Sequence, residues 1–204
     1  MISVLVPLLL LMAGPFWEAQ APKEWTDAQL EGLLADSPWA QVMAGPGQSA
    51  LAVNARLALA SPIEQAEKEQ ARRAALRSKP GAKKEASDEE DPGAREYRLW
   101  LEDNRATQII LAIRMTSNEG LLDEKEVRRM EDESVMRVGK KKIKMTGHFP
   151  PSAGDPFLRM AFPREVQLSD KSVIFDVYLP GVSAPFRSAE FKLKDMVVGG
   201  KLEL

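Results

Sequence analysis

The only histidine of the chain, His148, is the first side chain to consider for chemistry, because imidazole titrates near neutral pH. Ser152 and Asp155 follow a few residues later, and a serine, a histidine and an acid can form a nucleophilic triad. However, the chain has no G-x-S-x-G nucleophile elbow. A single histidine also cannot build a histidine-rich zinc site. We therefore predict a loop histidine, and assign no catalytic and no metal-binding residue.

The segment around His148, residues 147–164, is rich in proline and glycine yet carries three phenylalanines. Its aromatic side chains either pin the loop to the core or form a recognition surface. We expect pinning, and the same segment is also the best candidate for a binding edge. The candidate binding surface consists of His148, Phe149, Phe157, Arg159 and Phe162.

The densest basic patch consists of Arg137, residues 140–142 and Lys144. Such a patch can bind a phosphate-bearing polymer or an anionic lipid, but here no aromatic residues are interleaved to stack on bases. We interpret it as a solvated hairpin tip that guards a strand edge, and predict no nucleic-acid partner. The chain also lacks a phosphate loop and a dinucleotide-binding motif, so we expect no cofactor.

Composition describes an ordinary soluble globular chain of 204 residues, with 44% hydrophobic residues, 28% charged residues and a net charge of −2. There is no cysteine, which excludes thiol catalysis, zinc–thiolate sites, iron–sulfur clusters and disulfides. Acidic residues are numerous, and a catalytic pair of carboxylates therefore stays open as an alternative.

The N-terminus has the pattern of a signal peptide over residues 1–21. Residues 4–12 form an apolar run that is short for a membrane span, for which about 20 residues are needed. Gly14 and Pro15 then break the helix, and Ala19-Gln20-Ala21 supplies an A-x-A cleavage region. We therefore predict export to the periplasm or the medium.

Two features leave other fates of this leader open. No Lys or Arg precedes the apolar run, and Pro22 would directly follow the scissile bond, where proline is unfavourable for the processing peptidase. Alternatives are a cut after Ala13, a leader retained as a weak membrane anchor, or a buried N-terminal helix over residues 4–17.

Residues 22–77 are predicted to form a first helix–strand–helix unit. Its first helix begins at the capping box of Thr26 and Gln29. Ser37 and Pro38 have the pattern of a second helix start, with serine as N-cap and proline at the first helical position. A strand over residues 51–60 and a highly charged helix over residues 61–77 complete the unit.

Residues 78–93 contain prolines, glycines and a run of charges, which predicts a disordered linker. The remaining unit, residues 94–204, starts with a helix over residues 94–103, a strand over residues 107–115 and a charged helix over residues 123–133. The last third of the chain then alternates apolar and polar residues with a period of two, as strands do.

These patterns predict an α+β fold. Two helix–strand–helix units precede a mostly antiparallel β-sheet, and the helices cover one face of that sheet. The two units either form separate domains or contribute strands to a common sheet.

Residues 23–27 (KEWTD) followed by residues 36–40 (DSPWA) resemble the start of small exported bacterial proteins that are themselves uncharacterised. Residues 147–151 (GHFPP) and 155–159 (DPFLR) look like further shared segments. This resemblance implies export and carries no activity, catalytic residue or cofactor.

The leading functional hypothesis is an exported, non-catalytic envelope or secreted protein that acts through contacts with an unknown protein partner. An exported hydrolase built on carboxylates is the first alternative. A membrane-associated envelope component, which would contact the membrane only through a retained leader, is the second. The sequence does not indicate an oligomeric state.

Overall fold

The computed structural model describes residues 14–43, 45, 52–77, 91–152 and 155–204 of the chain. Within these residues the fold is α+β, as predicted, with antiparallel pairing throughout its sheets. The helices are α1 (Phe16–Ala19), α2 (Asp27–Ala35), α3 (Ser61–Arg77), α4 (Pro92–Asn104) and α5 (Glu124–Glu133).

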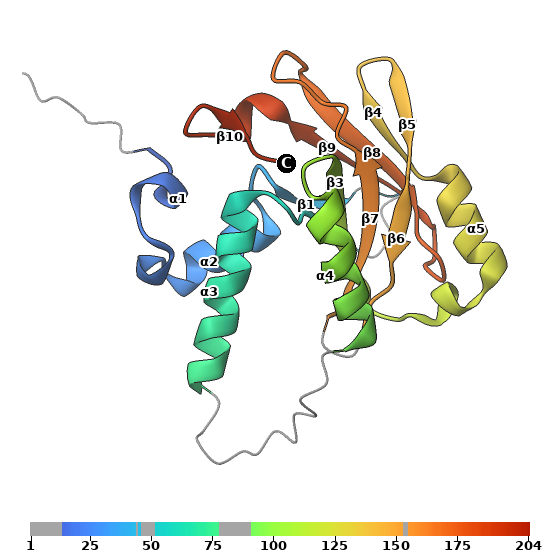
Figure 1. The fold of residues 1–204 in the computed structure, drawn as a ribbon, viewed down its shortest axis with the longest axis horizontal. Helices are drawn as coiled ribbons and strands as arrows, with labels where there is room; N and C mark the ends of the chain where they lie inside the picture. Colours follow the sequence, from blue (N-terminus) through green and yellow to red (C-terminus); the bar gives the residue numbers. More distant parts are fainter. Residues whose placement is uncertain (1–13, 44, 46–51, 78–90, 153–154) are drawn as a thin grey trace, which may run out of the picture.

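Two sheets form the centre of the molecule (Figure 1). The five-stranded sheet has the order β1 (Ala40–Met43), β2 (Val53–Leu57), β3 (Gln108–Arg114), β7 (Phe157–Pro163) and β6 (Gly147–Phe149). The four-stranded sheet has the order β5 (Lys141–Lys144), β4 (Val135–Val138), β8 (Ser172–Tyr178) and β9 (Phe186–Lys192). A small hairpin of β10 (Val197–Val198) and β11 (Lys201–Leu202) lies near the C-terminus.

The two sheets pack face to face, because each strand places alternate apolar side chains on an inner face. In β8, for example, Val173, Phe175 and Val177 are buried while the residues between them are partly exposed. The ring of Phe175 contacts Phe162 of the other sheet at 5.2 Å and Phe191 of β9 at 5.8 Å, between ring centroids. The predicted period of two is thus confirmed, and the apolar face of β8 lies at the centre of the core.

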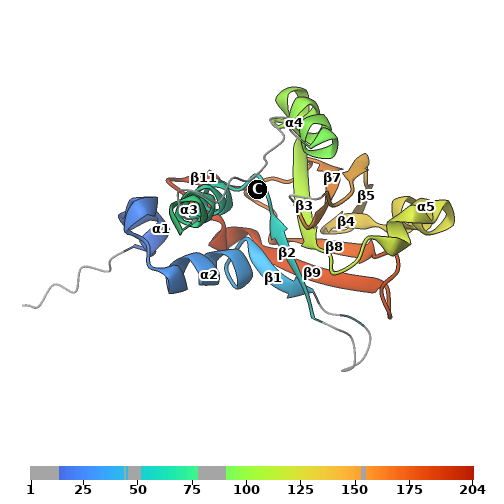
Figure 2. The same ribbon diagram turned by 90° about the horizontal axis from the view of Figure 1, so that it is seen from below.

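The prediction that the helices cover one face of one sheet is wrong. Helix α4 packs Trp100 and Leu101 against buried residues on the outer face of the five-stranded sheet. Helix α5 instead contacts the four-stranded sheet, where Arg129 and Glu126 bind the hydroxyl of Tyr178. Figure 2 shows α4 and α5 on different sides of the sandwich. Helices α2, α3 and α5 also add buried residues to the core between the sheets, among them Leu33, Ile63 and Met130, so the helices lie on more than one face of the fold.

Strands from both predicted units share the five-stranded sheet. Strand β2, from the first unit, pairs with β3, from the second, with Ala55 opposite Ile113 and Leu57 opposite Leu111. Of the two arrangements left open by the sequence, the structure therefore has the common sheet.

The helix predicted to restart at Ser37 and Pro38 is absent, and a tight turn leads into β1 instead. The hydroxyl of Ser37 donates to the carbonyl of Leu33 and accepts from the N–H of Trp39, and the Ser37 and Ala40 backbones bond reciprocally. Trp39 is fully buried, and its indole donates to the carbonyl of Glu203. This long-range anchor outweighs the local preference for a serine-capped helix.

Several other elements lie where the sequence predicts them. The Thr26–Gln29 capping box of α2 is formed with distances of 2.7 and 3.1 Å. Helix α3 spans the predicted residues, and its C-terminal half projects away from the sheets (Figure 1). The predicted strand over residues 51–60 is shorter, and ends at Leu57 in a turn.

The predicted linker lies mostly outside the described residues, because the structure describes nothing between residues 77 and 91. Its last three residues are ordered, contrary to the prediction. Asp91 caps α4 by accepting hydrogen bonds from the N–H groups of Gly93 and Ala94, and Pro92 is the first helical residue. The apolar run of the leader, residues 4–12, also lies outside the described part.

Candidate functional site

The structure places His148 in strand β6, opposite Met160 of β7, and not in a loop. Its Nδ1 lies 3.4 Å from the carboxylate of Glu131. Asp155 has different partners, since its carboxylate binds Arg159 and accepts from the N–H of Phe157. His148 and Asp155 are therefore engaged separately, and a triad is not formed.

The candidate binding surface is divided between three environments. Phe162 is completely buried between the sheets, so its role is in the core. His148 faces α5 through Glu131. Phe149, Phe157 and Arg159 lie together on the outer face of the five-stranded sheet, beneath α4. The segment is thus largely pinned, as expected, but to two different layers of the fold.

Around Arg159 the structure assembles a group that we call the arginine cluster: Arg56, Glu67, Tyr97, Asp155 and Arg159. Both arginines face the same side of the sheet, because each pairs with Ala112 of the central strand β3. The small side chain between them leaves room for the two guanidinium groups and their partners.

Each guanidinium of the arginine cluster has one carboxylate and one ring as partners. Arg56 binds Glu67 of α3 at 2.6 Å and stacks on Phe157, with its Cζ 3.9 Å from the ring centroid. Arg159 binds Asp155 and stacks on Tyr97 of α4 at 4.6 Å. Cation–π contacts of this kind are strongest where water is excluded. The cluster therefore joins α3, α4 and the sheet, with its charges balanced.

Burial shifts the acid–base properties of the arginine cluster. It raises the pKa of Glu67 above its ordinary value, although Arg56 opposes this effect. The same burial lowers the pKa of Arg56. The pKa of Tyr97 is raised to about 12, also mainly by burial. Perturbed groups are a feature of functional sites, and equally of structural ion-pair networks.

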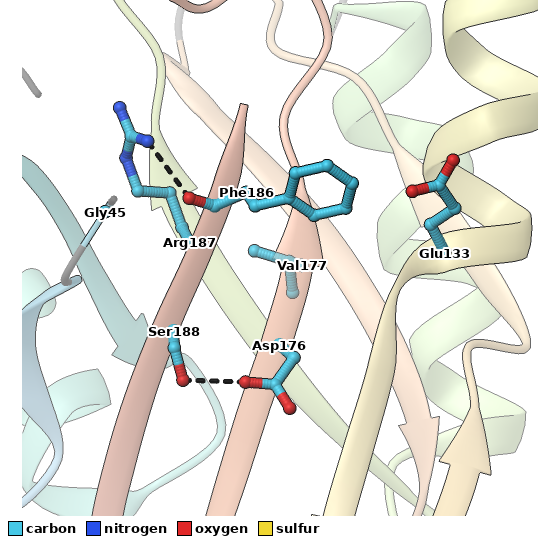
Figure 3. Close-up of a pocket in the computed structure, with 7 residues that line it drawn as sticks. All are labelled: Gly45, Glu133, Asp176, Val177, Phe186, Arg187 and Ser188. Carbon is cyan, nitrogen blue, oxygen red and sulfur yellow. Dashed lines mark hydrogen bonds between the residues drawn. The ribbon is translucent and has the colours of Figure 1, made fainter. Parts of the chain in front are cut away.

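A second site lies at one end of strands β8 and β9. A pocket of about 540 Å³, which we call the seam pocket, is lined by Gly45, Glu133, Asp176, Val177, Phe186, Arg187 and Ser188 (Figure 3). Its volume is typical of ligand sites in proteins. In Figure 3 Phe186 points toward the side of α5 while Arg187 points toward Gly45.

The two carboxylates of the seam pocket are already paired. Asp176 accepts hydrogen bonds from Arg137 and from the hydroxyl of Ser188. Although burial alone would raise the pKa of Asp176, these bonds hold it below its ordinary value. Glu133 binds Arg129 at 2.7 Å. The two carboxylates therefore offer no unbalanced negative charge to a ligand, whereas the guanidinium of Arg187, which also lines the pocket, donates to backbone carbonyls.

Arg187 is almost fully buried and closes the loop between β8 and β9. Its guanidinium donates to the carbonyls of Ser183, Ala184 and Phe186. These bonds hold the loop against the start of β9. The side chain is thus engaged within the fold and fixes the shape of the pocket wall.

Strand β9 is the last strand of its sheet, and the seam pocket lies beside its first half. The N–H of Leu179 donates to the carbonyl of Pro185, and together with the register this shows which residues of β9 direct their backbone groups toward β8. Backbone groups alternate in an antiparallel ladder, so those of Ser188 and Glu190 point away from β8. Strand β1 of the other sheet lies near β9 without pairing with it (Figure 2).

A second pocket, of about 420 Å³, lies beside the other half of β9 and is lined by Ser37, Pro38, Gln41, Glu190, Lys192 and Asp195. We call the two pockets and the strand edge between them the β9 groove. It follows the outer strand for most of its length, and combines a mostly apolar end with a polar end. An extended chain segment has the shape that such a groove accepts.

The basic patch at the β4–β5 hairpin is partly neutralised. Lys141 pairs with Glu165, and Lys144 lies 3.8 Å from Asp132. The hairpin turns at Gly139, which has a φ of 58°. This arrangement supports the interpretation of a solvated hairpin tip.

Of the arginine cluster, the sequence points to Arg159 as a binding residue and to Asp155 only as a possible triad acid, and it does not indicate Arg56, Glu67 and Tyr97 as site residues. The signal for the arginine cluster is weak, because Arg56 falls, like Asn54, on a partly exposed position of an alternating strand. No local pattern indicates the β9 groove, which depends on the position of β9 at the end of its sheet.

A comparison of the chain with models of known protein families finds no match, and neither curated proteins nor solved structures give one. Among the helices in the described part of the chain, none has the length and apolar character needed to span a bilayer. Across the same residues no group of three or more histidine and acidic side chains is arranged to hold a metal ion.

Proposed function

We propose that this chain is an exported, non-catalytic protein that binds an extended segment of a partner protein along the β9 groove. The observation that carries this proposal is the outer strand β9, whose outward backbone groups run between two pockets. The leader-like pattern of residues 1–21 supports export.

Backbone hydrogen bonds would supply much of the affinity. A partner strand that adds to a sheet edge bonds to alternate residues of the edge strand, here Ser188 and Glu190. The same edge explains the charged side chains of Glu190 and Lys192, because such residues discourage unspecific pairing of outer strands.

The seam pocket would supply the specificity. Its surface is mostly apolar, and both of its carboxylates already have arginine partners. An uncharged apolar side chain of the partner therefore fits, whereas a basic one would lose its hydration without gaining an ion pair with either carboxylate. Phe186, which is 46% exposed, is the residue best placed to contact it.

A photo-reactive phenylalanine analogue at position 186 tests this proposal in the native host. We expect a discrete covalent adduct with one partner protein after irradiation. The matched control carries the analogue at Leu168, which is 57% exposed and lies before the opposite end of β8. Adducts of equal yield and pattern from both positions would argue against a partner site at the groove.

The second candidate is an exported hydrolase at the arginine cluster, and the raised pKa of Glu67 near Asp155 is the observation that favours it. A protonated acid beside a carboxylate is a common catalytic arrangement. Under this alternative, Glu67→Gln would abolish the turnover of a hydrolase substrate while Glu190→Pro would leave it unchanged. The ion pairs that occupy both carboxylates make the protein-binding function the better supported one.

A further inference from the structure

Phe16 and Trp17 of helix α1, which precede residue 22, pack against the folded core in this structure. Phe16 lies edge-on to Trp25 at a centroid distance of 5.5 Å, and Trp17 lies edge-on to Trp39 at the same distance. Both N-terminal rings are partly buried and pack against the main core. Edge-to-face pairs of this kind add to the stabilisation that burial gives.

The two tryptophans that these rings cover are central to the fold. Trp25 is 2% exposed and Trp39 is fully buried. The indole of Trp39 also donates to the backbone of Glu203, so this region joins the two ends of the described chain. Removal of Phe16 and Trp17 would uncover one face of each tryptophan and leave a large apolar patch in water.

The predicted cleavage region is itself built into this arrangement. Ala19 is the last residue of α1, and the carbonyl of Gln20 accepts a hydrogen bond from the Trp25 indole at 3.2 Å. The N–H of Ala21 donates to the carboxylate of Glu24. The A-x-A motif thus takes part in the fold, as a link between α1 and the turn that starts at Pro22.

We propose that the leader is removed at the Ala13–Gly14 bond, so that the mature protein keeps residues 14–21 as the cover of its tryptophan core. Hydrolysis of this amide by one water molecule leaves a carboxylate on Ala13 and an amine on Gly14. Ala13 supplies a small side chain directly before the scissile bond, although Leu11 stands where an A-x-A site has its first alanine, and Gly14 avoids the proline that would follow a cut after Ala21. This inference rests on the export that we propose above.

The N-terminus of the protein recovered from its native host tests the cut. The full-length chain with its own leader is produced, the cells are fractionated, and the intact mass is measured in each fraction. An exported protein that starts at Gly14 is the expected result. A start at Pro22 in the exported fraction would overturn the inference but leave export standing. An intact Met1 would also overturn it, and if found in the cytosol would overturn export as well.

Two substitutions make the same test sharper. Ala13→Phe should block processing, because a bulky side chain precedes the scissile bond. Ala21→Phe, at an exposed position, should leave the mass of the removed leader unchanged. The reverse pattern would place the cut after Ala21 and contradict the inference.

The packing role of the retained segment has its own readout in the full chain. Trp17→Ala should lower Tm by roughly 4–10 °C and shift the emission of the remaining tryptophans to longer wavelength. Glu18→Ala, at an exposed neighbour, should change neither property. If Trp17→Ala prevents folding, Phe16→Leu is the milder variant, for which a smaller fall in Tm is expected. Unchanged melting and emission in both aromatic variants would show that the segment can be removed at no cost.

Discussion

Two partly buried arginines on the outer face of the five-stranded sheet show how this chain places charge against the fold. Arg56 and Arg159 each have a carboxylate and an aromatic ring as partners. Removing one member of such a set leaves another uncompensated, which costs about 3–5 kcal/mol in a fully buried pair. The Nε atoms of both arginines have no hydrogen-bond partner among the described residues, so the cost of removing these guanidinium groups from water is not fully offset.

The burial of Tyr97 predicts a late phenol titration. Because its pKa is raised to about 12, the neutral phenol favours the folded state. This contribution is complete below the ordinary value of 10.0 and is lost as the pH rises through about 12. Absorbance at the tyrosinate wavelength should therefore show no phenolate from Tyr97 at pH 10. In Tyr97→Phe the absorbance change at high pH should fall to that of Tyr178, whose pKa is also raised by burial. A normal titration of both tyrosines near pH 10 would contradict the burial of Tyr97.

Glu69 of α3 predicts a dependence of stability on acid. Hydrogen bonds from Arg72 and Arg73 lower its pKa from 4.5 to about 2. A lowered pKa means that the ionised carboxylate favours the folded state. Its contribution is present above pH 4.5 and is lost as the pH falls toward 2. The fall in Tm over this interval should be smaller for Glu69→Gln than for the wild type, as measured by thermal melting at each pH. Equal slopes would show that these bonds do not matter in solution.

At the scale of elements, α4 is held mainly by aromatic contacts with strand β6. Phe149 contacts Tyr97 at 5.0 Å and Trp100 at 5.1 Å, between ring centroids. No residue of α4 itself is fully buried, so the helix depends on this docking rather than on a core of its own.

Phe149→Ala should therefore release α4 locally. We expect a loss of about 2 kcal/mol of stability, less than for a fully buried phenylalanine because Phe149 is only partly covered. Hydrogen exchange should become faster for the amides of α4 and remain unchanged for α5. Leu168→Ala, at an exposed position, serves as the control. Equal protection of α4 in the wild type and in Phe149→Ala would refute this role.

Elements with a strong local signal could be predicted from the sequence, whereas those set by distant contacts could not. The capping box at Thr26 and the alternation in β8 are local, and both predictions hold. The segment at Ser37 has an equally good helix start, but Trp39 is drawn into the core by a bond to Glu203, 164 residues away. Strand β6 is short and ends at two prolines, so it has too few residues for a period to be recognised.

The same division applies to the candidate sites. Phe149, Phe157 and Arg159 could be singled out because aromatic residues are unusual in a segment rich in proline and glycine. Phe162, from the same segment, belongs to the core, since successive residues of a strand face opposite sides. The β9 groove arises only when the sheet order leaves β9 unpaired on one side, and sheet order is a property of the complete fold.

At the scale of the whole molecule, two sheets share one core and the C-terminal residues are fastened to it. Leu204 is 2% exposed, and the carboxylate of Glu203 accepts from the N–H of Ser61 at the start of α3. In the described residues the two large sheets end in four outer strands, β1, β6, β5 and β9. The β9 groove is the edge at which pockets, outward backbone groups and an exposed ring coincide.

Backbone pairing at β9 can be tested without changing the ladder between β8 and β9. Proline at position 190 removes an N–H that points away from β8, and proline is tolerated in outer strands at such positions. Glu190→Ala removes the same side chain but keeps the N–H, and is therefore the matched control.

The most direct measurement is the yield of the adduct formed from position 186 in these two backgrounds, with Tm measured to verify folding. The account predicts that Glu190→Pro abolishes the adduct while Glu190→Ala retains it, at similar Tm. An adduct that persists in a folded Glu190→Pro protein, or that is lost equally in both variants, would contradict binding of a partner strand along β9.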